Sequence, residues 1–132
     1  MKITVENYKN DKYYDRVKNS IHKLLLTKNE ISIINIFMEM SLLTEKNYFE
    51  WYKGNIPYLE KVINCNLSKI NRILRIIGYY CHDLNLGQKY NSYKHNRKIL
   101  KFSKTGDENI EKFYKIIYFI IGNYEKFKTK RL

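Results

Sequence analysis

The chain has 132 residues and a mass of 16.1 kDa, which is the size of one domain. Hydrophobic residues make up 44% of it and aromatic residues 15%, which excludes a disordered chain and predicts a packed core. The formal net charge of +12 indicates an anionic partner if the cations gather on one surface. With one proline and five glycines there are few helix breakers, so helices are favoured over many short strands.

Helical periodicity begins near the N-terminus. Residues 12–26 carry apolar side chains at helical spacing and predict a first helix. Thr27 and Glu30 have the spacing of a capping box, in which each side chain bonds a free backbone amide of the first turn. A second helix is therefore predicted from residue 31, with one apolar face that contains Ile31, Ile34, Phe37, Met38 and Leu42.

Two shorter helices are predicted before the middle of the chain. Thr44 is the expected N-cap of a helix that Gly54 ends. Asn55 is the expected cap of a short helix over Pro57–Ile63, where a proline in the first turn costs little. A tight turn at residues 64–66 follows.

The next helix is predicted from Ser68, as N-cap, to Leu84, and Gly87 is its expected end. Its apolar residues recur at helical spacing and form an inward stripe of Ile70, Ile73, Leu74, Ile77, Cys81 and Leu84.

After this helix the spacing of the apolar residues changes from that of a helix to that of a strand. Residues 88–93 and 98–103 predict the strands of a hairpin, with residues 94–97 as its loop. A capping motif at residues 105–108 predicts a last long helix over residues 107–127.

A short helix, a turn, a longer capped helix and a basic hairpin are the plan of a winged helix-turn-helix. The predicted fold class is therefore mainly α with a small β-hairpin wing, an α+β winged helix-turn-helix. Residues 1–132 are expected to form a single domain with an N-terminal helical extension and a C-terminal dimerisation helix.

The positive charge is concentrated in one part of the chain. Residues 68–104 contain nine Lys or Arg residues against Asp83 alone, whereas residues 31–67 and 105–123 are each slightly acidic. A basic block of this kind is typical of a surface that binds phosphates, and a solvated lysine-rich face is the alternative.

The polar face of the helix over residues 68–84 predicts binding to duplex DNA. A helix fits the major groove, where Arg and Lys donate to guanine and Asn pairs with adenine. The N-terminal half of a recognition helix lies deepest, so Lys69, Asn71 and Arg72 are the predicted base contacts. Ser68, Arg75 and Tyr79 are the predicted phosphate contacts.

The hairpin supplies a second predicted contact. Its loop is polar and basic, which suits a wing that lies along the DNA backbone or in a minor groove. Arg97 is the expected side chain in a narrow minor groove, and an ordinary exposed turn is the alternative. The predicted contacts of the hairpin are Lys94, His95, Arg97 and Lys98.

Residues 66–112 resemble winged-helix regulators of the MarR/PadR kind. Leu67-Ser68-Lys69 is similar to the turn that opens the recognition helix in those families, and Phe102–Gly106 is similar to the junction after the wing. Asn66 stands where glycine is usual, and residues 41–54 are longer than those families need. The chain also looks like TubR-type centromere-binding adaptors. These resemblances imply a transcriptional regulator or a DNA-partition adaptor, the latter with a tubulin-like GTPase as partner.

The pattern of the predicted C-terminal helix indicates the oligomeric state of the protein. Its apolar residues cover more than one face, which is typical of a helix buried on more than one side. A homodimer on paired half-sites is therefore expected, and a central core helix in a monomer is the alternative. The apolar residues are Ile110, Phe113, Tyr114, Ile117, Tyr118, Phe119, Ile120, Ile121 and Tyr124.

Two other classes of function were weighed. Arg75 and His82 have the spacing found in HEPN ribonucleases, but that spacing is common by chance and those enzymes need a helical bundle. RNA binding or a protein-only interaction module would use an exposed aromatic patch of Trp51, Tyr52 and Tyr58, although such aromatics also dock helices together.

No chemistry of an enzyme is visible. The three histidines are far apart, and there is no glycine-rich phosphate loop or paired-carboxylate site, so no catalytic residue, metal or cofactor is expected. Cys65 and Cys81 are predicted to be reduced core thiols. Without a signal-peptide pattern or a long apolar run, a cytoplasmic location without membrane contact is expected.

Overall fold

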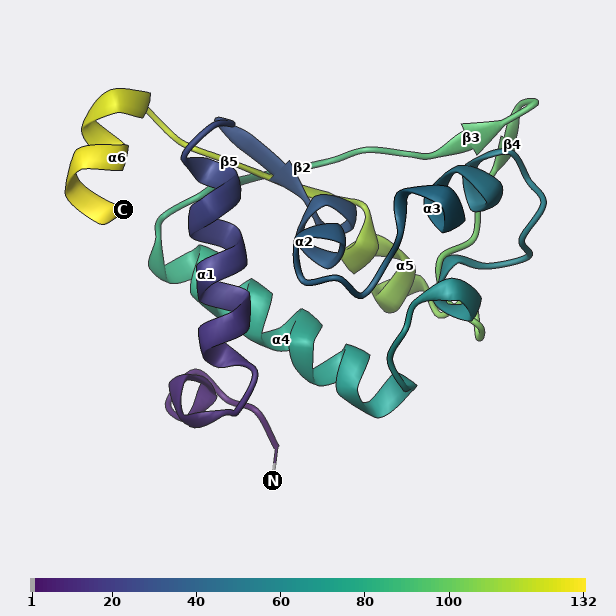
Figure 1. Cartoon of the computed structure of the whole chain (residues 1–132), viewed down its shortest axis with the longest axis horizontal. Helices are drawn as coiled ribbons and strands as arrows, with labels where there is room; N and C mark the ends of the chain where they lie inside the picture. The colour runs from purple at the N-terminus through teal and green to yellow at the C-terminus, as the bar shows by residue number, and fades with distance from the viewer. Residues whose placement is uncertain (1) are drawn as a thin grey trace.

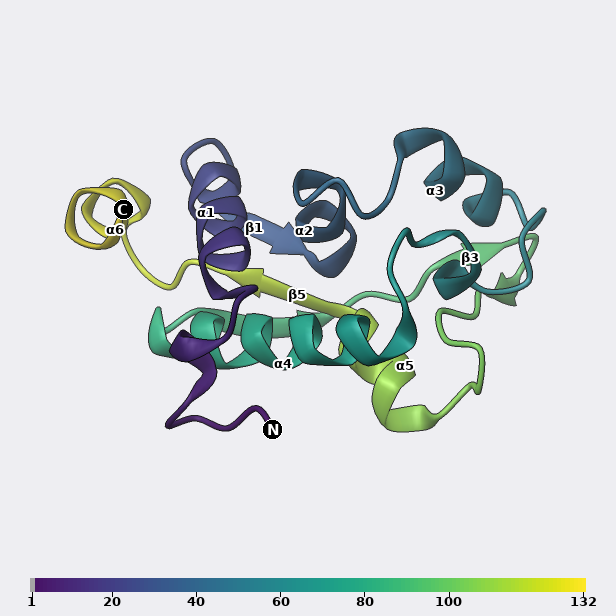
Figure 2. The same cartoon turned by 60° about the horizontal axis from the view of Figure 1, so that its bottom comes forward.

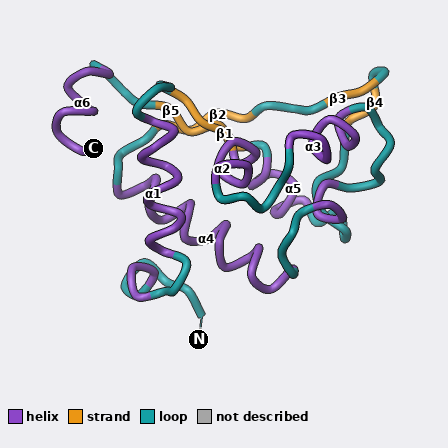
Figure 3. The backbone as a smooth tube through the Cα atoms, in the orientation of Figure 1, coloured by secondary structure: helices purple, strands orange, loops and turns teal. Residues whose placement is uncertain are grey.

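The structure, a computed structural model, describes residues 2–132 as an α+β fold (Figure 1). The strands cross the upper part of the molecule in the view of Figure 3, and α1, α2 and α4 lie below them. In chain order the elements are η1 (Tyr8–Asn10), α1 (Tyr14–Leu25), β1 (Glu30–Ser32), α2 (Ile33–Glu39), α3 (Glu45–Tyr52), η2 (Leu59–Val62), α4 (Leu67–Asp83), β2 (Gly87–Tyr90), β3 (Lys94–His95), β4 (Lys98–Ile99), α5 (Glu108–Tyr114), β5 (Ile116–Phe119) and α6 (Tyr124–Arg131).

A three-stranded antiparallel sheet has the order β1–β5–β2, so the last strand in the chain is the central one. In its register Tyr118 of β5 lies between Ile31 of β1 and Gln88 of β2. Ile116 and Tyr118 are buried on one face of β5, as the alternation of a strand requires. The sheet thus joins segments that are distant in sequence.

The helices α1, α2 and α4 pack on this sheet and on one another. Val17, Ile21 and Leu25 of α1 are fully buried at helical spacing. The inward stripe predicted for α4 is confirmed, and it determines which side of α4 faces outward. Its six residues Ile70, Ile73, Leu74, Ile77, Cys81 and Leu84 are all buried.

Two insertions form a second packed region beside the sheet. Residues 40–66 separate α2 from α4, and residues 91–115 separate β2 from β5. Their aromatic rings pack together: the ring of Phe102 lies 4.9 Å from that of Trp51, tilted by 47°, and stacks on that of Tyr114 at 5.1 Å, centroid to centroid. This contact fixes the β3–β4 hairpin and α5 against α3.

Two helices begin at other caps than predicted. Ser32, and not Thr27, caps α2: its hydroxyl accepts from the N–H of Asn35 at 3.0 Å, and the Asn35 side chain accepts from the N–H of Ser32. Residues 30–32 pair with β5, so the helix cannot start before this pairing ends. Asn66, and not Ser68, caps α4. Both true caps are polar residues only a few positions from the predicted ones.

The remaining helix boundaries agree with the prediction in one case and differ in two. The prediction for α3 is confirmed, since Thr44 accepts from the N–H of Asn47 and Gly54 follows the helix with φ +84°. The helix predicted over Pro57–Ile63 is instead the shorter 3-10 turn η2. The end of α4 is set by Asn85 in the left-handed region, with φ 58°, and not by Gly87.

The long helix predicted over residues 107–127, and with it the proposed dimerisation helix, is wrong. The segment contains α5, β5 and α6 in succession, and Gly122 with φ +82° lies before α6. Isoleucines in this segment satisfy helical and strand spacing equally over a short window. Residues 116–119 form a strand because they pair with both β1 and β2.

The hairpin is smaller than predicted. Residues 87–90 pair with β5 and not with residues 98–103, while β3 pairs with β4 alone. Asn96 and Arg97, both with positive φ, form the two-residue turn between β3 and β4, as right-handed strand twist favours.

Candidate nucleic-acid interface

The outward face of α4 lies opposite its buried stripe. Ser68, Asn71, Arg75 and His82 occupy this face and all are exposed. Within residues 2–132, Arg75 makes no ion pair or hydrogen bond. One helix face therefore offers a hydroxyl, an amide, a guanidinium and an imidazole, which are groups that bind base edges and phosphates.

Asn66 is the N-cap of α4. The side chain of Asn66 accepts from the N–H of Lys69 at 2.9 Å, so the Ser68 hydroxyl has no capping role. Ser68 and Lys69 are both exposed at this end of the helix. Ser68, Asn71 and Arg75 thus share one exposed face of α4, and Lys69 is exposed next to Ser68 in the first turn. Their contact with DNA stays a prediction.

Arg72, a predicted base contact, is engaged within the protein by the N-terminal segment. Its guanidinium forms an ion pair with Asp11, whose side chain is only 1% exposed. The other oxygen of Asp11 accepts from the N–H of Tyr13 at 2.9 Å. The Nε of Arg72 is buried and has no hydrogen-bond partner among the described residues. Arg72 therefore holds the N-terminal segment, residues 2–13, against the flank of α4.

Tyr79 also faces the N-terminal segment. Its ring lies 5.6 Å from that of Tyr8, and the Tyr8 hydroxyl donates to Asp83 near the end of α4. Burial and the Asp83 carboxylate raise the pKa of Tyr8, so its hydroxyl stays protonated at neutral pH. The half-buried Tyr79 thus supports this contact, where a phosphate contact was predicted.

The four hairpin residues Lys94, His95, Arg97 and Lys98 lie together but apart from α4. Figures 1 and 2 show the hairpin beside α3, whereas α4 runs along the opposite edge of the molecule with the N-terminal segment next to it. The His95 ring packs closely on Gly54, after α3. The predicted site is therefore split into an α4 group and a hairpin group.

Two carboxylates that sequence reasoning did not single out hold the loop at residues 101–106. Glu111 accepts two backbone N–H groups of this loop, at 2.9 and 2.6 Å, and Glu60 accepts a third at 3.0 Å. Glu60 is buried and also accepts from the Tyr114 hydroxyl at 2.7 Å. Burial and the Glu60 charge raise the pKa of Tyr114, which keeps this donor protonated. A lone acid in a sequence gives no signal of such a contact.

A shallow hollow lies between α4 and α5. Its volume is about 260 Å³, and it places the Asn109 side chain of α5 close to two predicted contacts of α4. The sequence carries no signal for Asn109, because nothing local indicates that α5 lies beside α4. The lining residues are Asn71, Leu74, Arg75, Asn109, Ile110 and Phe113.

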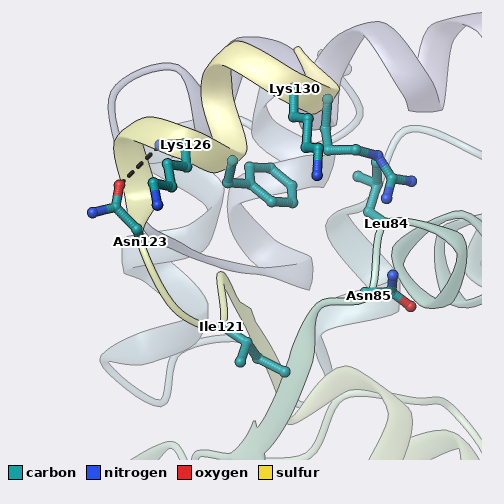
Figure 4. Close-up of a pocket in the computed structure, with 8 residues that line it drawn as sticks. Leu84, Asn85, Ile121, Asn123, Lys126 and Lys130 are labelled. Atoms are coloured by element: carbon teal, nitrogen blue, oxygen red, sulfur yellow. Dashed lines mark hydrogen bonds between the residues drawn. The ribbon is translucent and has the colours of Figure 1, made fainter.

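A second hollow, of about 380 Å³, lies at the other end of the molecule between α6 and the turn after α4 (Figure 4). Its lining includes Leu84 after α4 and, from α6, Lys126, Phe127 and Lys130. In Figure 1 α6 lies beyond the C-terminal end of α4, so this hollow is separate from the predicted base contacts.

The described residues hold no cluster of potential metal ligands. Residues 2–132 contain no group of three or more His, Cys, Asp or Glu side chains that could hold a metal ion, and no helix among them is long and apolar enough to span a bilayer. Cys81 is fully buried, and burial raises the pKa of its thiol. Trp51 is also fully buried, so the predicted exposed patch of Trp51, Tyr52 and Tyr58 does not form.

Comparisons with protein-family models, with curated proteins and with solved structures find no match for this chain.

Proposed function

We propose that the protein binds double-stranded DNA through α4, as a winged helix-turn-helix protein. The observation that carries the proposal is the outward face of α4, where Ser68, Asn71 and Arg75 are exposed beside Lys69 and Arg75 has no partner among residues 2–132. An α-helix with free amide and guanidinium groups matches the dimensions and hydrogen-bond pattern of the major groove.

The order of the elements supports the winged helix-turn-helix class. The helices α1, α2 and α4 are followed by β2 and β5, which pair with each other, and a recognition helix followed by a hairpin is the plan of a winged domain. Residues 91–115 take the place of the wing and residues 40–66 extend the turn, so both are longer than in the simple motif.

The charge supports a nucleic acid as the partner. Lys69, Arg75 and the loop lysines Lys101 and Lys104 are exposed, and none of them has an acidic partner within residues 2–132. Neutralised phosphates release counterions, which is the main source of affinity in such complexes. The sheet of the fold departs from the helical bundle that a HEPN ribonuclease needs, although Arg75 and His82 share one face of α4.

Binding to duplex DNA tests the proposal directly. Selection from a random duplex pool should recover a preferred site, and Arg75→Ala should weaken binding to that site by about 1–3 kcal/mol and relax its sequence preference. Lys46→Ala, an exposed lysine of α3 far from α4, is the matched control and should bind like the wild type. Fluorescence anisotropy with duplex, single-stranded DNA and RNA competitors measures both effects.

Equal effects of the two substitutions would contradict recognition by α4, and stronger competition by single-stranded DNA or RNA would assign the protein to the other class of partner. Footprinting on the DNA next to its gene separates the two biological roles. A single palindrome at a promoter supports regulation, and a row of short repeats supports DNA partition.

A further inference from the structure

The N-terminal segment occupies the position beside α4 that was expected for the hairpin. Figures 1 and 2 show it along α4, on the side away from the β3–β4 hairpin. Its contacts with α4 include the ion pair of Asp11 with Arg72, the hydrogen bond of Tyr8 to Asp83 and the contact of the Tyr8 ring with Tyr79. The segment is thus part of the folded structure next to the outward face of α4.

The contact between the segment and α4 leaves a hollow of about 360 Å³. Basic and amide side chains dominate its polar lining. The guanidinium group of Arg72 belongs to this lining, and its Nε is buried without a hydrogen-bond partner among the described residues. The residues that line the hollow are Ile3, Asn7, Asn10, Asp11, Lys12 and Arg72.

Asp11, the one acid in this lining, already has hydrogen-bond partners within the protein. Both oxygens of Asp11 are hydrogen-bonded, one by Arg72 and the other by the N–H of Tyr13, and its side chain is almost fully buried. Lys12 is exposed, and its ammonium group lies 5.3 Å from the centre of the Tyr13 ring. The two cations that line the hollow, Lys12 and Arg72, therefore outnumber its one acid, Asp11, and favour an anionic ligand.

Two further charges lie nearby. Lys9 is exposed and its ammonium group lies 4.0 Å from Asp83, whose carboxylate also accepts from Tyr8. Glu6 is exposed on the same segment. Lys9 and Lys12 thus place two exposed ammonium groups on the segment beside α4.

We propose that residues 9–12 bind the phosphodiester backbone at the edge of the major groove that α4 enters, with the hollow of Lys12 and Arg72 receiving one phosphate. This inference rests on the proposed function. When a helix lies in the major groove, the backbone at the groove edge passes along its flank, and phosphate contacts there set the register of the helix. The N-terminal segment, in place of the hairpin, supplies these contacts.

The test compares two charge-matched double variants of the full chain. Lys9→Gln/Lys12→Gln removes two cations beside α4, and Lys46→Gln/Lys53→Gln removes two exposed cations of the α3 region. The first variant should lower the slope of log affinity against log salt by about 1–2, because each phosphate contact contributes about 0.9. It should do so equally for preferred and non-preferred duplexes, whereas the α3 variant should keep the wild-type slope.

Ethylation interference then locates the contact. Ethylated phosphates at the groove edge should impair binding of the wild type but not of the first variant, and circular dichroism should show that both variants fold. Equal slopes for the two variants would overturn the inference. Binding of inorganic phosphate alone that depends on Lys12, without a change in the DNA slope, would also overturn it and assign the hollow to a free anion.

The proposed function fails in a different way. If the wild type has no affinity for duplex DNA, the recognition by α4 is wrong. If it binds and Arg75→Ala relaxes its preference while the Lys9/Lys12 variant behaves like the α3 control, only the role of the N-terminal segment is wrong.

Discussion

Tyrosines join η1 and α1 to α4. Tyr8, Tyr14 and Tyr80 form edge contacts of aromatic rings with centroids 5.7 to 5.8 Å apart. The Tyr80 hydroxyl is also hydrogen-bonded to His22 of α1. Burial raises the pKa of Tyr80 to about 12 and lowers the pKa of His22, because both charged forms would lose water. At the residue scale the fold therefore depends on neutral phenol and imidazole groups.

Alkaline pH should destabilise the protein. The pKa values of Tyr8, Tyr80, Tyr114 and Tyr118 are raised by burial, so the unfolded chain ionises first as the pH rises above about 10. The free energy of unfolding is unaffected by these groups below that pH and falls above it. Tyrosinate absorbance and circular dichroism should change together. Tyr118→Phe should reduce the loss of stability at high pH, and ionisation of all tyrosines before unfolding would contradict the argument.

At the scale of elements, β5 decides the course of the C-terminal third. Its pairing with β1 and β2 satisfies backbone groups on both sides, which a helix over the same residues would have satisfied internally. The strand also brings Phe119 over Gly87, and a Cβ at Gly87 would lie 2.4 Å from that ring. The absence of a side chain at Gly87 is therefore a requirement of the sheet, where the sequence suggested the end of a helix.

Gly87→Ala should destabilise the protein by about 1–3 kcal/mol, because the Phe119 ring must move from its packed position. Gln88→Ala, at the next and exposed position of β2, is the control and should change stability by less than about 0.5 kcal/mol. Urea unfolding followed by circular dichroism gives both values. Equal stabilities of the two variants would mean that Phe119 does not lie over Gly87.

For the whole molecule, the apolar residues that predicted a dimer interface have another use. Ile116, Tyr118 and Ile120 are buried within one copy of the chain. The actual C-terminal helix, α6, has no buried residue and carries four basic residues, so two copies of it would repel each other. The structure thus removes the helix on which the expected homodimer depended.

Sedimentation velocity without DNA should therefore show a monomer of 16.1 kDa. The result should hold at low salt, where like charges on α6 repel most strongly. A dimer that persists under these conditions would require an interface other than the one predicted from the sequence. Binding to a duplex with two sites would then show whether pairing occurs on DNA.

Local sequence determined the features that depend on neighbours within a few residues. The apolar stripe of α4, the cap at Thr44 and the basic block at residues 68–104 were all readable, because helical spacing, side-chain caps and charge are local properties. The exposure of Ser68, Lys69, Asn71 and Arg75 follows from that stripe.

Tertiary structure decided everything that depends on distant partners. Arg72 forms an ion pair with Asp11, residues 116–119 form the central strand of the sheet, and the hairpin lies beside α3 and not beside α4. Each of these outcomes joins residues that are far apart in the chain, by an ion pair, strand pairing or ring stacking. No periodicity within one segment encodes such a contact, because its energy depends on where the other segment lies.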